Sequence, residues 1–93
     1  MKYVWDENKN RENIRKHHID FIDAVEMFEG DYFDAFDNMH SLYEDRFKAI
    51  GYIRNIPIVL IYSTHGNETI RIISARKAKK HEEKNYWNKL GTS

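Results

Sequence analysis

The feature that most constrains the fold is one apolar run, residues 56–62 (IPIVLIY), in a chain otherwise rich in charge. Its Ile and Val residues are branched at Cβ, which favours a strand, and apolar side chains at successive positions would face both sides of a sheet. Pro57 stands near the start, where a strand tolerates proline. The run therefore predicts a central strand covered on both faces, and it is far too short to span a membrane.

Turn residues divide the rest of the chain into shorter elements. We expect strands at about residues 3–5, 32–37, 46–52, 57–62 and 69–75, and helices that start after Asp6, after Asp20 and near Lys79. The short turns 54–55 and 65–67 predict an antiparallel meander of the last three strands. Helices segregated from strands indicate an α+β fold. The prediction is a single domain, residues 1–93, with an antiparallel sheet of about four to five strands, two N-terminal helices and one C-terminal helix.

The two N-terminal helices differ in their patterns. The first is polar and rich in Asn, with Ile14 as its main apolar residue, so we expect it on the surface. In the second, Phe21, Ile22, Val25 and Phe28 follow helical spacing and predict one apolar stripe facing the core.

Composition narrows the function classes. The chain has 93 residues, of which 32% are charged, and it has no cysteine, which excludes disulfides and thiolate metal sites. It starts without the apolar stretch of a signal peptide, so we expect a cytoplasmic protein. The net charge of zero hides a division: residues 1–46 carry 12 acidic and 6 basic side chains, and residues 47–93 carry 3 and 9. Either the basic half binds a polyanion, or the two halves attract each other.

The densest basic segment is residues 71–89, with seven Lys or Arg and two Glu. Strands hold few isolated arginines, so Arg71 and Arg76 are candidates for phosphate binding, with Lys77 beside them. Lys79 and Lys80 either extend a surface for RNA or form an ordinary solvated helix face. By regular strand alternation Arg71 and Arg76 face opposite sides, so they share a site only if the strand twists or ends before Arg76.

Two further basic residues, Arg46 and Lys48, alternate with Phe47 and Ala49 and therefore share one strand face. They are candidates for RNA binding. Among the five histidines, His17 and His65 are the better candidates for acid–base chemistry, although a lone histidine is more often structural.

No histidine pair has the spacing of a zinc site, so no metal or other cofactor is expected. Asp31, Asp34 and Asp37 could in principle bind Mg²⁺, but a spacing of three along a strand does not converge them. Of the aromatic residues, Tyr86 lies among lysines and is open to a functional role, whereas core packing is expected for Tyr62 and Trp87.

The order of these residues resembles the BrnT toxin family. The matching positions are Val4-Trp5-Asp6, Lys9, Asn13, Lys16-His17, Phe21, Ala24, Arg46, Ile50-Gly51, Tyr62, then Ile70-Arg71-Ile72-Ile73-Ser74-Ala75-Arg76 with Ala78, Glu82 and Tyr86. The resemblance covers about residues 4–87. The chain departs from it at His18, where the family often has glycine, and at Lys79, where it often has threonine.

The resemblance implies a RelE-like fold and a bacterial endoribonuclease that inhibits translation. It also implies a cognate partner, a BrnA-like antitoxin with a ribbon-helix-helix domain, through which the complex binds operator DNA. No membrane association is expected.

Metal-free RNA cleavage needs charge stabilisation at phosphorus and proton transfer at the 2′-hydroxyl. Arg71, Arg76 and Lys77 are candidates for the first role, and Lys16, His17 and Tyr86 for the second. Two alternatives remain open, a non-catalytic module that binds RNA or protein with its basic face, and a metal-dependent nuclease built on the three aspartates.

Overall fold

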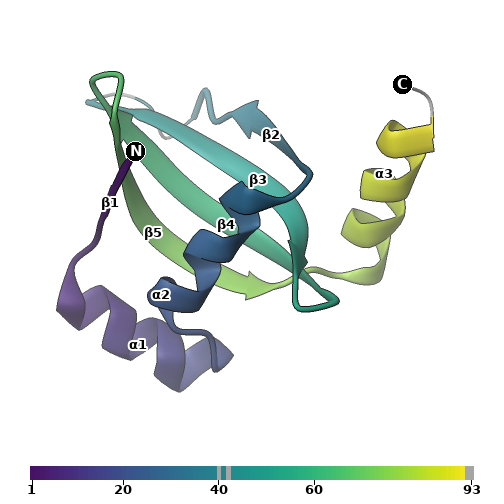
Figure 1. Cartoon of the computed structure of the whole chain (residues 1–93), viewed down its shortest axis with the longest axis horizontal. Helices are drawn as coiled ribbons and strands as arrows, with labels where there is room; N and C mark the ends of the chain where they lie inside the picture. Colours follow the sequence, from purple (N-terminus) through teal and green to yellow (C-terminus); the bar gives the residue numbers. More distant parts are fainter. Residues whose placement is uncertain (40, 42, 92–93) are drawn as a thin grey trace.

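One five-stranded sheet organises this computed structural model, which describes residues 1–39, 41 and 43–91 (Figure 1). In chain order the elements are β1 (Lys2–Val4), α1 (Glu7–His17), α2 (Phe21–Ala24), the 3₁₀-helix η1 (Val25–Glu29), β2 (Tyr32–Phe36), β3 (Asp45–Ile53), β4 (Ile56–His65), β5 (Thr69–Lys77) and α3 (Lys80–Gly91). The α+β fold class is confirmed. None of the described helices is long and apolar enough to cross a membrane.

The strand order is β1-β5-β4-β3-β2, so the apolar strand β4 lies at the centre, as expected. Strands β2 to β5 form an antiparallel meander, and the predicted pairing of the last strand with residues 58–62 is confirmed. The prediction of a wholly antiparallel sheet is wrong, because β1 pairs with β5 in parallel. Residues 5–68 separate these two strands, so no local turn signal specifies their relative direction.

The hydrophobic core lies on one face of the sheet, which we call the core face. Leu60 and Ala75 are fully buried there, and α2 and η1 cover them by inserting Phe21, Ala24 and Met27. Figure 1 shows these two helices crossing the front of the sheet. Ile70 and Ile72 also lie on this face, as predicted.

The prediction that Ile22 belongs to the apolar stripe of the second helix is wrong, because Ile22 is 64% exposed. The helix changes to 3₁₀ geometry after Ala24, and three residues per turn align positions three apart. Phe21, Ala24 and Met27 therefore form the buried row in place of the expected α-helical stripe.

The helix α1 packs through its amides rather than through Ile14, which is 37% exposed. The buried Asn13 side chain donates to the carbonyl oxygen of Ala75 at 2.9 Å and accepts from its N–H at 3.1 Å. β1 pairs with β5 only as far as Arg71, so the Asn13 side chain takes the place of a neighbouring strand for the N–H and C=O groups of Ala75. The buried Asn10 side chain accepts from the N–H of Phe21 in the same manner. The helix lies on the surface, as expected, and its buried amides rather than an apolar stripe make the contact with β5 and α2.

Candidate functional site

A bulge in β5 decides which side chains share a face. Ile61 pairs with Ser74 and Tyr62 with Ile72, so Ile73 is an extra residue that shifts the alternation. Arg71, paired with Ser63, and Arg76, paired with Val59, therefore lie on the same side of the sheet. The expectation that they face opposite sides is wrong for this reason. β5 runs past Arg76 to Lys77, so a bulge, and not an early end of the strand, lets the two arginines share a face.

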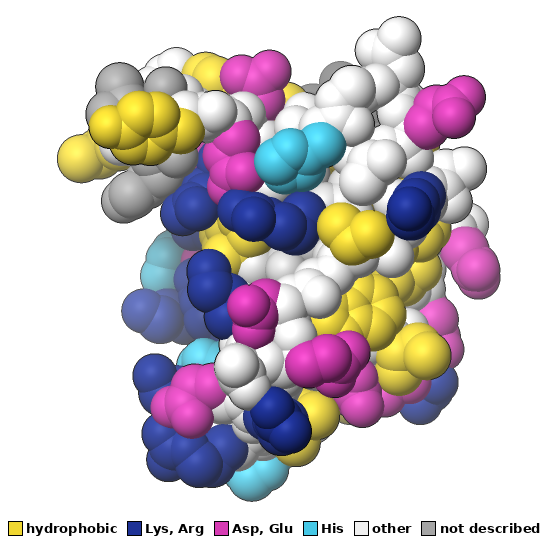
Figure 2. All heavy atoms as spheres, turned by 90° about the vertical axis from the view of Figure 1, so that its left-hand side faces the viewer, with side chains coloured by type: hydrophobic (Ala, Val, Ile, Leu, Met, Phe, Trp, Pro, Cys, Tyr) yellow, Lys and Arg dark blue, Asp and Glu magenta, His cyan; other side chains and the backbone are white. Residues whose placement is uncertain are grey.

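This side of the sheet, opposite the core face, carries four cations on β3 and β5, the two strands that flank β4. Arg46 and Lys48 of β3 pair with Ser63 and Ile61 of β4, which places them beside the arginines of β5. We call the surface formed by Arg46, Lys48, Arg71 and Arg76 the basic face. Figure 2 shows Lys and Arg side chains gathered mainly on the side that lies behind the sheet in Figure 1.

At one end of the basic face, α3 brings Glu82 against Arg76. The guanidinium donates two hydrogen bonds to the carboxylate, both 2.9 Å long, and Lys48 Nζ lies 3.3 Å from it. The backbone N–H of Lys79 donates a further bond of 2.8 Å. The hydrogen bonds from Arg76, then those from Lys79 and Lys48, outweigh burial and hold the pKa of Glu82 well below its usual range.

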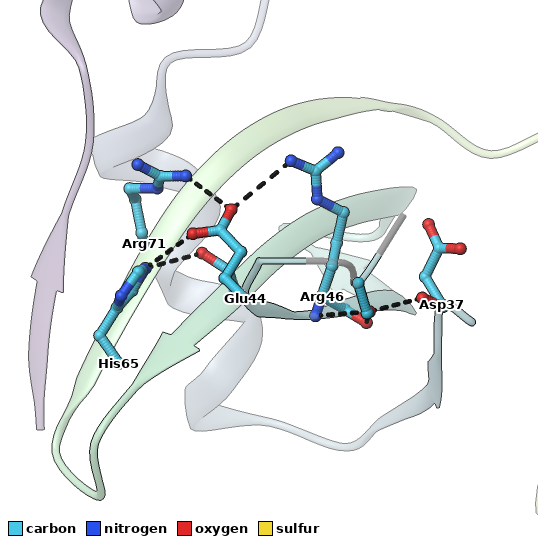
Figure 3. Close-up of polar contacts among 7 residues, drawn as sticks. Asp37, Glu44, Arg46, His65 and Arg71 are labelled. Carbon is cyan, nitrogen blue, oxygen red and sulfur yellow. Dashed lines mark hydrogen bonds and ion pairs between the residues drawn. The ribbon is translucent and has the colours of Figure 1, made fainter. Parts of the chain in front are cut away.

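At the other end, Glu44 lies among three partners (Figure 3). Its Oε1 is 2.6 Å from Arg71 Nη2 and 3.5 Å from Arg46 Nη2, and its Oε2 is 3.1 Å from His65 Nε2. Burial raises the pKa of Glu44. The charge and hydrogen bond of Arg71, the charge of His65 and the hydrogen bond of Arg46 together outweigh burial, so the pKa is lowered. Within the described residues the buried Nε of Arg46 has no acceptor, so this guanidinium keeps a free donor.

Two predicted proton-transfer candidates lie beside the basic face. Lys16 and His17 of α1 line a hollow of about 210 Å³ with Ser74 and Ile73, at the bulge between Arg71 and Arg76. The structure therefore brings α1 next to the two arginines from the open edge of β5.

Other candidates lie elsewhere. Lys77 lines a hollow on the core-face side of the sheet with Ile58 and Arg54, away from Arg76.

The aromatic candidate Tyr86 is 5% exposed and packs against Phe33 and Tyr52. Trp87 is 53% exposed, so the expectation of core packing is wrong for it and correct for Tyr62. The reason is the rotation of α3, which directs Tyr86 toward the sheet.

Lys79 and Lys80 are exposed at the start of α3. The three aspartates do not form a metal site: in the part of the chain that is described, no three His, Cys, Asp or Glu side chains come together as metal ligands. Asp34 instead accepts a hydrogen bond from the Tyr62 hydroxyl on the core-face side. His40 lies outside the described residues.

Neither carboxylate of this site was predicted from the sequence as a site residue, although Glu82 is among the positions that match the BrnT family. Glu82 had a detectable signal, because a Glu three residues after a helix N-cap commonly accepts a bond from the cap N–H. Glu44 had none, since it reaches Arg71 and His65 from a loop distant in sequence.

Comparisons with known proteins identify the family of the chain. Residues 5–82 match the family model described as the ribonuclease toxin BrnT of type II toxin–antitoxin systems. A 1.1 Å crystal structure of the Brucella abortus ribonuclease toxin BrnT is similar, with 34% identity and a TM-score of 0.66, over 86% of this chain and 99% of that one. No curated protein sequence matches the chain. The chain therefore belongs to the BrnT family of ribonuclease toxins of type II toxin–antitoxin systems.

Proposed function

We propose that the chain is a metal-independent endoribonuclease whose basic face binds single-stranded RNA and whose activity inhibits translation in the cytoplasm. Residues 1–93 act as one toxin domain. The observation that carries the proposal is the placement of Arg71 and Arg76 on one face by the bulge at Ile73, beside Arg46 and Lys48. A row of cations on one open face suits an RNA backbone.

Glu82 marks a place for a phosphate. Its carboxylate accepts from a guanidinium fork, an ammonium group and a backbone N–H, which are the donors that a phosphate oxygen binds. An RNA phosphate that replaces Glu82 would keep these contacts. Arg76 would then stabilise the charge that develops on phosphorus during attack by the 2′-hydroxyl.

A free toxin must be restrained, so the basic face is also a sensible place for its antitoxin. We propose a BrnA-like ribbon-helix-helix antitoxin that covers this face and links the complex to operator DNA. Lys79 and Lys80, exposed beside Arg76, would steer an acidic partner.

The test is cleavage of RNA by the purified free protein, with and without EDTA. We expect cleavage that persists in EDTA and leaves 2′,3′-cyclic phosphate ends. Loss of cleavage in EDTA would contradict metal independence, and binding without cleavage would favour a non-catalytic module.

A further inference from the structure

We propose that His65 is a catalytic residue of this ribonuclease, which takes the proton from the attacking 2′-hydroxyl, and that Glu44 is its positioning residue. The inference deepens the proposed function of the basic face and rests on it. It assigns the proton transfer to a group at the end of β4, rather than to the candidates Lys16, His17 and Tyr86.

The first argument is position. His65 lies two residues after Ser63 on the same side of β4, so it is next to the cross-strand row of Arg46, Ser63 and Arg71. Its side chain is 43% exposed, which leaves it accessible to a substrate on the basic face. Tyr86 is buried, whereas His65 lies at an open end of the sheet.

The second argument is orientation. Glu44 Oε2 lies 3.1 Å from His65 Nε2 (Figure 3). Ser63 Oγ lies 3.1 Å from the same nitrogen. Glu44 is itself held by Arg71 at 2.6 Å. A carboxylate on one ring nitrogen holds the proton there and leaves the other nitrogen, Nδ1, as the base. Within the described residues, no carboxylate forms such an ion pair with His17.

The step balances with groups on this face. The O2′ proton passes to His65 Nδ1 while the O2′–P bond forms, and the P–O5′ bond then breaks to give a 2′,3′-cyclic phosphate. The leaving O5′ takes a proton from water, and the hydroxide that remains takes the proton from His65, which restores the base. Glu44 stabilises the imidazolium that forms, and Arg71 lies close enough to the same carboxylate to bind the phosphate next to His65.

The decisive variant is His65→Gln, compared with His81→Gln, an exposed histidine at the start of α3. Removal of a general base typically slows a reaction by about a hundredfold or more, so we expect that loss for His65→Gln only, with cooperative melting retained. The acid limb of the rate–pH profile should disappear in the same variant. If the wild-type protein cleaves RNA and His65→Gln cleaves it at the same rate, this inference is overturned and the proposed function stands. A wild-type protein that does not cleave RNA would overturn both.

Two further measurements separate the roles. With RNA that has sulfur at the 5′ bridging position, the leaving group needs no acid, so His65→Gln should remain slow. Recovery of the rate would show that His65 is an acid and would overturn its assignment as the base.

Glu44→Gln should cleave RNA more slowly than wild type and shift the acid limb of the rate–pH profile, while RNA binding does not weaken. Faster cleavage by Glu44→Gln would show that Glu44 only shields Arg71, which overturns its positioning role.

Discussion

The two faces of the sheet are built from alternate residues of the same strands, yet different forces hold them. On the core face Leu60 and Ala75 are fully buried under Phe21 and Met27. On the basic face the next positions along the strands are Ile61 and Arg76, and carboxylates from other elements hold the cations in place. The difference teaches that the core face supplies most of the stability, while the basic face is free to carry chemistry.

The basic face is not uniform either. Near α3 the aromatic rings of Tyr52, Tyr86 and Phe33 pack together and cover one end of it. Toward His65 none of the described helices covers the surface, and Glu44 comes from the loop before β3. The open end is therefore where we place the proton transfer.

The largest effect should come from Leu60→Ala. The substitution leaves a cavity on the fully buried core face, and such changes cost roughly 3–5 kcal/mol of unfolding free energy. Urea unfolding measures the loss. The matched control is Ile61→Ala, one residue along on the basic face, which we expect to cost less than half as much. Equal losses would break the distinction between the two faces.

Next comes Arg76→Ala, which should slow RNA cleavage by about a hundredfold or more, because loss of a charged transition-state contact costs roughly 3 kcal/mol. The variant should still melt cooperatively, with a stability loss of roughly 1 kcal/mol, because it breaks the same ion pair as Glu82→Gln. Arg76→Lys should restore only part of the rate, since it lacks the guanidinium fork.

The control for Arg76→Ala is Arg54→Ala. Arg54 also has two carboxylate partners, Asp23 and Glu26, but it lies on the core-face side. Single-turnover cleavage should be unchanged in it. Full activity of Arg76→Ala at equal concentration would place the site elsewhere, and an unfolded variant would show that Arg76 is structural.

Asn13→Ala tests the amide contact that joins α1 to the edge of β5. It leaves the buried N–H and C=O of Ala75 without this partner, so we expect a loss of roughly 2 kcal/mol in thermal or urea unfolding. The exposed Asn88→Ala in α3 is the control and should change stability little. A loss no greater than that of the control would mean that water replaces the Asn13 amide.

A smaller effect is expected for Glu82→Gln, and it should depend on pH. The pKa of Glu82 is lower in the folded than in the unfolded protein, so its ion pair stabilises the fold above the ordinary glutamate pKa. The stabilisation by this ion pair decreases as the pH falls below the ordinary glutamate pKa toward the pKa of Glu82 in the folded protein. We expect a loss of roughly 1 kcal/mol at neutral pH, after allowance for partial exposure, and less at acidic pH.

Unfolding of wild type and Glu82→Gln at both pH values checks this dependence. The variant Glu68→Gln, exposed in the turn between β4 and β5, is the control. A difference between wild type and Glu82→Gln that grows on acidification would contradict the assigned ion pair.

The smallest expected effect is on the rate at which the antitoxin associates with the chain. Charge reversal at Lys79 and Lys80 should slow association several-fold at low salt and little at high salt, because steering by exposed charge is screened. Stopped-flow mixing with the antitoxin measures it. Rates that respond to neither salt nor the reversals would argue against docking on the basic face.

The sequence by itself determined most of the element order. The apolar run of β4 predicted a central strand, and Asp6 and Asp20 predicted two helix starts, both confirmed as side-chain caps. These signals are local, since caps, turns and strand propensity depend on neighbouring residues. Arg46 and Lys48 also shared a face by alternation alone.

Only the tertiary structure decided the rest. The parallel pairing of β1 depends on a contact between opposite ends of the chain, and the bulge at Ile73 depends on how β5 fits both β4 and the Asn13 amide. The acidic and basic halves do pair, at Arg71 with Glu44 and at Arg54 with Asp23, but the basic face survives this pairing. A bulge and a long-range ion pair leave no periodic trace in sequence, because each is selected by its partners in space and not by its neighbours along the chain.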